Sequence, residues 1–434
     1  MNRIIDLFDR FMQRYTPDPF VFAVLLSFLV MVLGVGATDA GPLLMLEYWG
    51  EGFWNLTTFT LQMVMVLLGG YLIAASAPIQ SLLRRCAASV RSNGQAVIMV
   101  TLVSALTSWI NWGFGLIAGA FLALELARIV PQANFRLYVA SAYSGFIVWH
   151  GGLSGSIPLL INTEGNFSQQ WIGSTIPVSQ TMFSPLNIIL LLSMVITLPL
   201  LNWILSRHQT APVTLPAVDK PPEPAPTQTP VERLERSSLL GILTALVGLS
   251  YILLELVNQS FSLDINRVNF IFLFLALLLH GNFRNFLNAT MEGASKVGPL
   301  LIQYPFYAGI MYMMTESGLA NQISQGFVSI ASETTFSLYA FFSAGLVNFF
   351  VPSGGGQWAV QAPIIIQAAD SMGLDLAKPI MAVAWGDAWT NLAQPFWALP
   401  ILAIAGLKAR DIMGYCLIGL VVSGVIIATW LLIL

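Results

Sequence analysis

Long apolar segments alternate with short polar ones along the whole chain, and this pattern predicts a bundle of membrane helices. A membrane span requires ~20 mainly apolar residues. The candidate spans cover residues 20–37, 54–77, 137–160, 184–206, 238–257, 268–282, 296–316, 379–405 and 412–434. We therefore predict an all-α, multi-pass membrane protein.

Two further apolar regions, 97–130 and 335–370, have Gly, Asn and Pro near their centres. Each could be a pair of spans or a re-entrant hairpin. With arms of about 15 residues, a helix rising 1.5 Å per residue reaches only ~22 Å. Because the hydrocarbon core is ~30 Å thick, the arm length favours re-entrant hairpins.

Cations collect on one side of this arrangement, and positive loops face the cytoplasm in bacterial membrane proteins. With the N-terminus cytoplasmic, only Arg267 and Lys378 of the 18 cations fall outside. The cations predicted inside are Arg3, Arg10, Arg14, Arg84, Arg85, Arg91, Arg128, Arg136, Arg207, Lys220, Arg233, Arg236, Arg284, Lys296, Lys408 and Arg410. We expect an inner-membrane protein with a periplasmic C-terminus.

Composition agrees with a chain embedded in a lipid bilayer. It is 56% hydrophobic and 9% charged, whereas soluble domains carry roughly 25% charged residues. This excludes a soluble enzyme, a disordered chain and a nucleic-acid-binding protein that needs a basic face. With three histidines, two cysteines and no triad, metal or phosphate-loop spacing, we expect no enzyme and no cofactor.

The chain divides at a proline-rich stretch near its middle. Residues 207–236 are rich in Pro and suit a solvated cytoplasmic linker. They separate residues 19–206 from residues 237–434. Residues 1–18 carry apolar side chains at helical spacing between charged ones, which predicts a short amphipathic helix in the membrane interface.

The two halves contain matching positions in the same order. The matched positions are Gln62, Tyr71 and Ser76 with Gln303, Tyr312 and Ser317; Ser104, Asn111 and Gly113 with Ser343, Asn348 and Gly354; and Trp149, Ser154 and Pro158 with Trp385, Thr390 and Pro395. The helix that carries Gln62 and the helix that carries Gln303 are predicted to run in opposite directions through the membrane. Such inverted repeats are typical of secondary transporters, whose sites lie at discontinuous helices near the midplane.

Four irregular segments at membrane depth form the predicted site: two hairpin tips and two broken helices. Freed amides at a half-helix start suit a carboxylate, and freed carbonyls with Ser, Thr and Asn oxygens suit a small cation. The candidate substrate-binding residues are Asn111, Trp112, Gly113, Gly115, Ser154, Gly155, Ser156, Asn348, Ser353, Gly354, Gly355, Gly356, Gln357, Thr390, Asn391 and Gln394. Close helix packing is the alternative role for each Gly and Ser.

The distribution of charged residues limits which ligands are expected. No Lys or Arg lies deep in a predicted span, which favours a small monoanion over a substrate with several carboxylates. Asp387 is the one acid predicted mid-span beside Gly, Thr and Asn, and such a group is expected to be functional. Its alternative is a structural, hydrogen-bonded acid. His150 is the corresponding candidate in the first half, with packing as its alternative.

Several strings in these segments resemble the bacterial short-chain fatty acid transporter family, from about residue 15 to the C-terminus. They are Asp18 to Phe20, Gly52 to Leu56, Ile110 to Gly115, Pro305 to Gly309, Val351 to Gly356, Ala393 to Pro400 and Arg410 to Cys416. The resemblance implies uptake of acetoacetate, butyrate and similar monocarboxylates. It also implies membership of the wider ion-transporter superfamily, with inverted repeats, paired re-entrant hairpins and an often homodimeric, elevator-like mechanism.

The resemblance also bears on the two titratable candidates. The family pattern usually has an acid at the position of Asp387 and glycine at that of His150, which favours Asp387 as the general coupling residue. We therefore expect a symporter for short-chain fatty acid anions, coupled to a proton or Na⁺ at Asp387. A Na⁺ ion could use Asn111, Asn348, Thr390 and Asn391.

Trp112, Trp149, Trp358 and Trp385 are candidates to surround the alkyl chain, or they only pack. The rival functions are a carrier of another organic anion, such as a dicarboxylate or an amino-acid derivative, and a passive anion channel.

Overall fold

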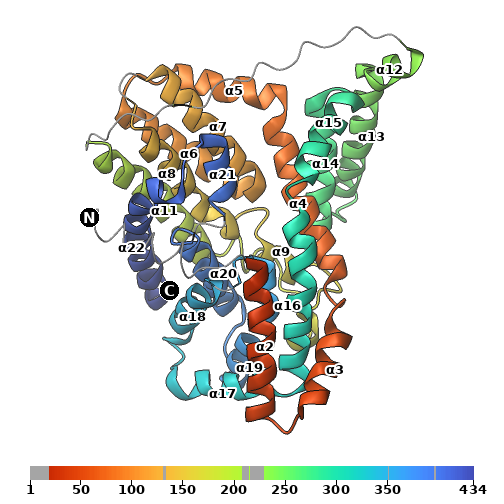
Figure 1. Cartoon of the computed structure of the whole chain (residues 1–434), viewed down its shortest axis with the longest axis vertical. Coiled ribbons are helices and arrows are strands. Elements are labelled where there is room, and N and C mark those ends of the chain that lie inside the picture. The colour runs from red at the N-terminus through yellow and green to blue at the C-terminus, as the bar shows by residue number, and fades with distance from the viewer. Residues whose placement is uncertain (1–18, 131–132, 208–214, 216–228, 350, 395–396) are drawn as a thin grey trace.

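The computed structural model describes residues 19–130, 133–207, 215, 229–349, 351–394 and 397–434. Within these residues the chain forms helices and no strand, as Figure 1 shows. The all-α architecture predicted from the apolar pattern is therefore confirmed. The interfacial helix expected at residues 1–18 lies outside the described residues.

The helices of the first half follow the predicted spans closely. They are α2 (Pro19–Ala37), α3 (Pro42–Gly52), α4 (Thr57–Ala75), α5 (Ala77–Ala88), α6 (Asn93–Ile110), α7 (Trp112–Ile129), α8 (Phe135–Gly145), the 3₁₀ helix η1 (Phe146–Gly151), α9 (Ser156–Asn162), α10 (Gln169–Ile172) and α11 (Pro185–Leu205).

The second half begins after the linker, whose last residues form the short helix α12 (Pro230–Glu235). Its helices are α13 (Ser238–Val257), α14 (Ile265–His280), α15 (Phe283–Ala294), α16 (Gly298–Glu316), α17 (Leu319–Ile330), α18 (Phe336–Asn348), α19 (Gly354–Ser371), α20 (Ala377–Thr390), α21 (Leu399–Ala405) and α22 (Ala409–Ile433). Within the described residues, eight segments are long and apolar enough to cross a membrane, which defines a multi-pass membrane protein.

The helices form two groups that lie side by side in Figure 1. In one group α16 packs on α2 and α3, and α14 packs on α4 and α13. In the other, α6 packs on α7, α8 and α11, while α22 packs on α8 and α11. Helix α4 contacts α7 and so joins the two groups.

Burial separates lipid-facing helices from the helices that build the centre. Helix α2 exposes Leu25, Phe28 and Val32, as expected for side chains solvated by lipid tails. By contrast the segment from α8 to α9 is almost entirely buried. Helices α19 and α20 are also largely buried, and they carry polar side chains that lipid would not tolerate.

Each half contains a helical hairpin, α6–α7 in the first and α18–α19 in the second. The arms of the first hairpin are longer than expected, with 18 residues each instead of about 15. At 1.5 Å per residue they reach about 27 Å, close to the ~30 Å core. Arm length therefore does not distinguish a re-entrant hairpin from two spans in the first half, and re-entry stays a prediction.

Each hairpin is followed by a broken helix, and the order is the same in the two halves, as predicted. Helix α8 continues into η1, and four residues from Gly152 to Gly155 separate it from α9. Helix α20 ends at Thr390 and α21 begins at Leu399. Pro158 lies in the first turn of α9, so the glycines before it make the break. The matching Pro395 lies outside the described residues.

Candidate functional site

The two broken helices meet at a buried pair of titratable side chains. Nδ1 of His150, at the end of η1, lies 2.9 Å from Oδ2 of Asp387 in α20. The side chains of both residues have no exposed surface. The chain therefore places the mid-span acid of one repeat against the only titratable side chain at the equivalent break of the other.

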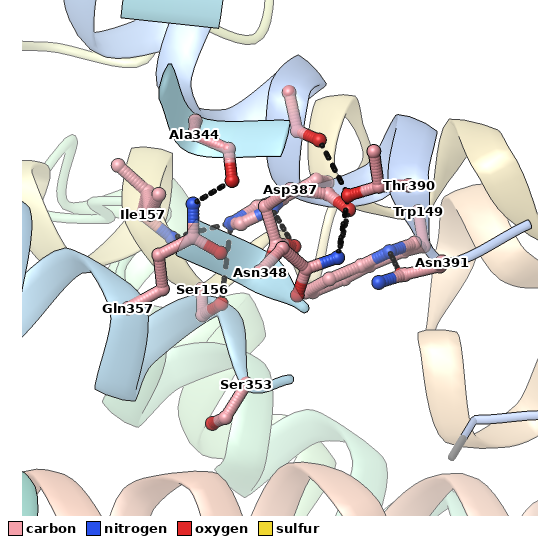
Figure 2. Close-up of polar contacts among 12 residues, drawn as sticks. Trp149, Ser156, Ile157, Ala344, Asn348, Ser353, Gln357, Asp387, Thr390 and Asn391 are labelled. Carbon is pink, nitrogen blue, oxygen red and sulfur yellow. Dashed lines mark hydrogen bonds and ion pairs between the residues drawn. The ribbon is translucent and has the colours of Figure 1, made fainter. Parts of the chain in front are cut away.

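The contacts of the second imidazole nitrogen determine the protonation of His150. The backbone N–H of Ile157 donates to Nε2 of His150 at 3.2 Å, and the hydroxyl of Ser156 lies 3.2 Å from the same atom (Figure 2). Nε2 is thus an acceptor, and the ring proton belongs on Nδ1, where it is donated to Asp387. With this tautomer a neutral imidazole donates to Asp387, so the pair carries one buried negative charge when Asp387 is ionised.

The first turn of α19 lies beside this pair, and the Gly356 amide donates a hydrogen bond to the Tyr304 hydroxyl. Ser353 precedes the helix but does not cap it with its side chain; its Oγ instead lies 2.8 Å from the Tyr304 hydroxyl of α16. The first three residues are Gly354, Gly355 and Gly356. The first N–H groups of a helix have no intrahelical partner and carry partial positive charge, which suits an anion.

This turn requires glycine because neighbouring side chains approach its backbone closely, and not because the backbone is strained. A Cβ on Gly354 would lie 2.6 Å from Cε1 of His150 and 2.7 Å from Oγ of Ser156. A Cβ on Gly355 would meet the Phe59 ring at 2.3 Å, and one on Gly356 would meet the Tyr307 ring at 2.5 Å. The second hairpin tip is therefore held against α4, α16 and the His150 break.

The first turn of α7 differs, because its amides have partners. The Asn111 side chain accepts from the Phe114 N–H at 2.9 Å and donates to the Val66 carbonyl at 3.1 Å. The Trp112 N–H donates to Oγ of Ser154 at 2.9 Å. A Cβ on Gly115 would lie 2.0 Å from Oγ of Ser108, so this glycine serves close packing inside the hairpin.

Asn348, at the end of α18, connects the second hairpin to α20 through hydrogen bonds. Its Nδ2 donates to the Asp387 carbonyl at 2.8 Å and to Oγ1 of Thr390 at 2.9 Å. Gln357 donates to the Ala344 carbonyl at 2.9 Å. Oδ1 of Asn348, Oε1 of Gln357 and Oδ1 of Asp387 are buried and have no hydrogen-bond partner among the described residues. Figure 2 shows these three side chains at the place where α18, α19 and α20 meet.

The remaining predicted residues connect the halves. Nε1 of Trp149 donates to Oδ1 of Asn391 at 3.0 Å, and the Tyr143 hydroxyl donates to the Asn391 carbonyl at 2.7 Å. Gln394 is buried and follows Asn391 in the break of the second half. A Cβ on Gly155 would lie 2.3 Å from the His150 carbonyl, so this glycine permits the sharp turn of the first break.

A small cavity of about 10 Å³ lies between the hairpin tips. Trp112 and Trp149 line it, whereas Nε1 of Trp358 bonds to Ser168 and Nε1 of Trp385 bonds to Asn187. The other lining residues are Met63, Phe146, Ser156, Leu300, Tyr304, Ser353, Gly354, Gly355 and Trp397. This volume suits about one water molecule, so a carboxylate with an alkyl chain enters only if the tips move apart.

The structure brings most of the predicted residues together, but their roles differ. Ser156, Ser353, Gly354, Gly355, Trp112 and Trp149 line the cavity, whereas Asn111, Gly115 and Ser154 stabilise the first hairpin and its neighbours. Sequence reasoning missed Tyr304, Leu300 and Trp397. Tyr304 directly precedes the string Pro305 to Gly309, and Trp397 lies inside the string Ala393 to Pro400. The strings that carry the family resemblance therefore marked both positions.

The site places the start of a helix, where an anion would be favoured, beside a buried acid. Among the described residues no group of three or more His, Cys, Asp or Glu could hold a metal ion. Two hairpin tips and two broken helices that meet at the centre of a multi-pass bundle define the chain as a membrane transporter.

Known proteins agree with this class and give the family. The short-chain fatty acid transporter family profile matches residues 1–434, so the chain belongs to that family. It is 42% identical to a protein of Escherichia coli (strain K12) over 435 residues, with 98% of each chain covered. It is 39% identical to a protein of Haemophilus influenzae (strain ATCC 51907 / DSM 11121 / KW20 / Rd), with 97% of each covered. Both bear the provisional name of short-chain fatty acid transporter.

A solved structure shares the fold. The YdaH transporter of Alcanivorax borkumensis, described as having an unusual topology, superposes with a TM-score of 0.62 over 95% of this chain and 98% of its own. The two sequences are 17% identical, so this likeness concerns the fold alone.

Proposed function

We propose that the protein is an inner-membrane symporter that imports short-chain fatty acid anions, such as acetoacetate and butyrate, with a proton or Na⁺. One observation carries the proposal: the uncapped first turn of α19 lies beside the buried pair of His150 and Asp387. An anion site and a charge-compensating acid thus occupy one place in a chain of the short-chain fatty acid transporter family.

The carboxylate of the substrate binds at the second hairpin tip. The amides of Gly354 and Gly355 and the hydroxyls of Ser156 and Ser353 are the donors that face the cavity. The alkyl chain lies against Trp112 and Trp149. No Lys or Arg lines this cavity, which supports a monocarboxylate because a second carboxylate would have no cation to balance it.

Charge balance explains why a cation accompanies the anion. An ionised Asp387 gives the pair one buried negative charge, and a second anion beside it is strongly unfavourable in a low dielectric. Protonation of Asp387 removes that charge before the carboxylate arrives. Release of the proton on the cytoplasmic side then expels the anion, so the two movements are linked.

Na⁺ is the alternative coupling ion, and the unpartnered oxygens favour it. Oδ1 of Asn348, Oε1 of Gln357 and Oδ1 of Asp387 offer the oxygen ligands that a hard cation prefers. Here a Na⁺ ion would neutralise Asp387 in place of a proton. Asn111 and Thr390, two further candidate Na⁺ ligands, already use their side chains in hydrogen bonds.

Uptake of labelled butyrate into proteoliposomes tests the proposal. We expect accumulation driven by either a proton gradient or a Na⁺ gradient, and Asp387→Asn reduces gradient-driven accumulation more than tenfold because a neutral side chain exchanges no charge. Asp370→Asn, an exposed acid at the end of α19, is the matched control and keeps wild-type uptake.

Experiments that remove one ion gradient at a time identify the coupling ion. Loss of uptake when only the proton gradient is collapsed assigns the proton, and loss when only Na⁺ is removed assigns Na⁺. Full gradient-driven accumulation by Asp387→Asn refutes the coupling role. Flux that ignores both gradients in the unsubstituted protein refutes symport.

A further inference from the structure

A second, larger cavity lies next to the site, towards the end of the bundle where α15 gives way to α16. It has a volume of about 180 Å³ and is enclosed by α4, α7, α16 and α21. Its walls are formed mainly by Leu67, Leu116, Ile117 and Leu399, with Gly113 of the first hairpin tip at one end. The cavity is thus an apolar chamber several times larger than a water molecule.

One cation lines this chamber. Lys296, in the turn before α16, places its ammonium 5.5 Å from the centre of the Tyr71 ring. The ring holds the ammonium at the mouth of the chamber through a cation–π contact. The Glu292 carboxylate lies near the Tyr71 hydroxyl, on the preceding helix α15. No other Lys or Arg lines the chamber.

The chamber and the small cavity between the hairpin tips share a wall. Leu300 and Trp397 line both cavities, and both side chains are buried. A molecule that leaves the tips in this direction passes between these two side chains and enters the chamber. Lys296 precedes α16 on the side predicted to be cytoplasmic.

We propose that this chamber is a second binding site for the transported anion, a cytoplasmic vestibule in which Lys296 holds the carboxylate and the apolar walls hold the alkyl chain. The proposal rests on the proposed function, because it assigns a path to that substrate. An apolar space with a single ammonium at its mouth complements an amphiphile with one negative head and a short tail. Leu300 and Trp397 form the barrier between the two sites.

The vestibule explains how a site without cations attracts an anion from the cytoplasmic face. The amides at the hairpin tip are buried and exert little attraction over a distance, whereas an ammonium at the membrane surface raises the local concentration of anions. This attraction is screened by salt, because Lys296 is exposed. The vestibule therefore affects encounter from one face and leaves coupling at Asp387 unchanged.

Transport of labelled butyrate measured separately from each face tests the vestibule. In membrane vesicles of defined orientation, Lys296→Gln raises KM from the cytoplasmic face by roughly fivefold, the effect of one partly exposed ion pair. The same variant leaves KM from the opposite face unchanged. Lys296→Arg keeps the wild-type KM, and Lys296→Glu raises it further. Lys408→Gln, an equally exposed cation outside the vestibule, is the matched control and has no effect.

Salt provides a second readout. In the unsubstituted protein, KM from the cytoplasmic face increases with ionic strength, and in Lys296→Gln this dependence disappears. Equal KM values for Lys296→Gln and Lys408→Gln from that face would overturn the vestibule while butyrate transport itself persists. Absence of butyrate transport in the unsubstituted protein would overturn the proposed function instead.

Discussion

The two hairpin tips occupy equivalent places in the repeat, but only the first has side chains that cap the amides of its second helix. In the first tip, Asn111 and Ser154 occupy the amides of Phe114 and Trp112. In the second, the side chain of Ser353 does not cap α19, and Asn348 bonds to α20 instead of to its own hairpin. The second tip thus has no side-chain cap, and of its glycine amides that of Gly356 donates to the Tyr304 hydroxyl.

This difference shows how one repeated element serves two purposes. A buried polar group with all its partners stabilises a fixed structure, whereas one without partners is unfavourable unless a ligand, water or ion pairs with it. Under the proposed function, the first tip is therefore a support, and the second is the part that binds the anion. Its partner α20 carries Asp387, the proposed coupling residue.

Glycine substitutions at the two tips are expected to produce the largest contrast. In Gly354→Ala the added Cβ meets His150 and Ser156 within 2.7 Å. In Gly113→Ala the nearest atom is the Leu67 carbonyl oxygen at 3.0 Å. We expect Gly354→Ala to reduce butyrate uptake at least tenfold, because the added atom displaces groups that hold the anion.

Gly113→Ala should retain most of the uptake, and proteoliposome assays at matched protein content check both variants. Equal losses in the two would remove the functional distinction between the tips.

Removal of the cap from the first tip should affect stability more than transport. Asn111→Ala leaves the Phe114 amide and the Val66 carbonyl without their side-chain partner. Loss of a helix cap lowers the free energy of unfolding by about 1–2 kcal/mol. A lower melting temperature in detergent, with near-normal KM for butyrate in the folded fraction, is the expected result.

Asn93→Ala, which removes the acceptor of the Asn134 amide and of the Tyr138 hydroxyl at the start of α6, is the control for a general loss of stability and should lower the melting temperature without changing KM. A raised KM with unchanged melting temperature in Asn111→Ala would assign substrate binding to the first tip.

Two serine substitutions should give the smallest effects, again of different kinds. Ser154→Ala removes the acceptor of the Trp112 amide and lowers stability by about 1 kcal/mol. Ser353→Ala removes a hydroxyl that lines the cavity and bonds to Tyr304, and it raises KM roughly threefold, as loss of one weak neutral hydrogen bond to the substrate does. Thermal melting and butyrate KM measured on both variants check the contrast. It fails if Ser353→Ala lowers the melting temperature and leaves KM unchanged.

Much of the fold could be predicted because lipid imposes simple requirements on the sequence. Apolar runs such as 184–206 and 238–257 correspond to α11 and α13 within a few residues. Where a helix is buried against other helices, the apolar signal weakens, and boundaries are harder to place. The arms of the first hairpin extend further than their central apolar stretch indicated for this reason.

The residues of the candidate site could be predicted from the sequence, but the contacts between them could not. Asp387 was recognised because an acid at membrane depth is costly wherever it lies. The contact of His150 with Asp387 could not be predicted, since the two residues are 237 positions apart and no local pattern connects them. The Ile157 amide that determines its tautomer becomes its neighbour only through the break before α9.

The sequence by itself determined the membrane class, the helices, the order of hairpin and broken helix in each half, and the absence of a cation deep in any predicted span. These follow from composition and periodicity, which act along the chain. Only the tertiary structure decided that side chains cap the first tip, that none caps the second, and that Lys296 lines a chamber beside the site. The physical reason is that hydrogen-bond saturation and cavity shape depend on partners brought together across both repeats.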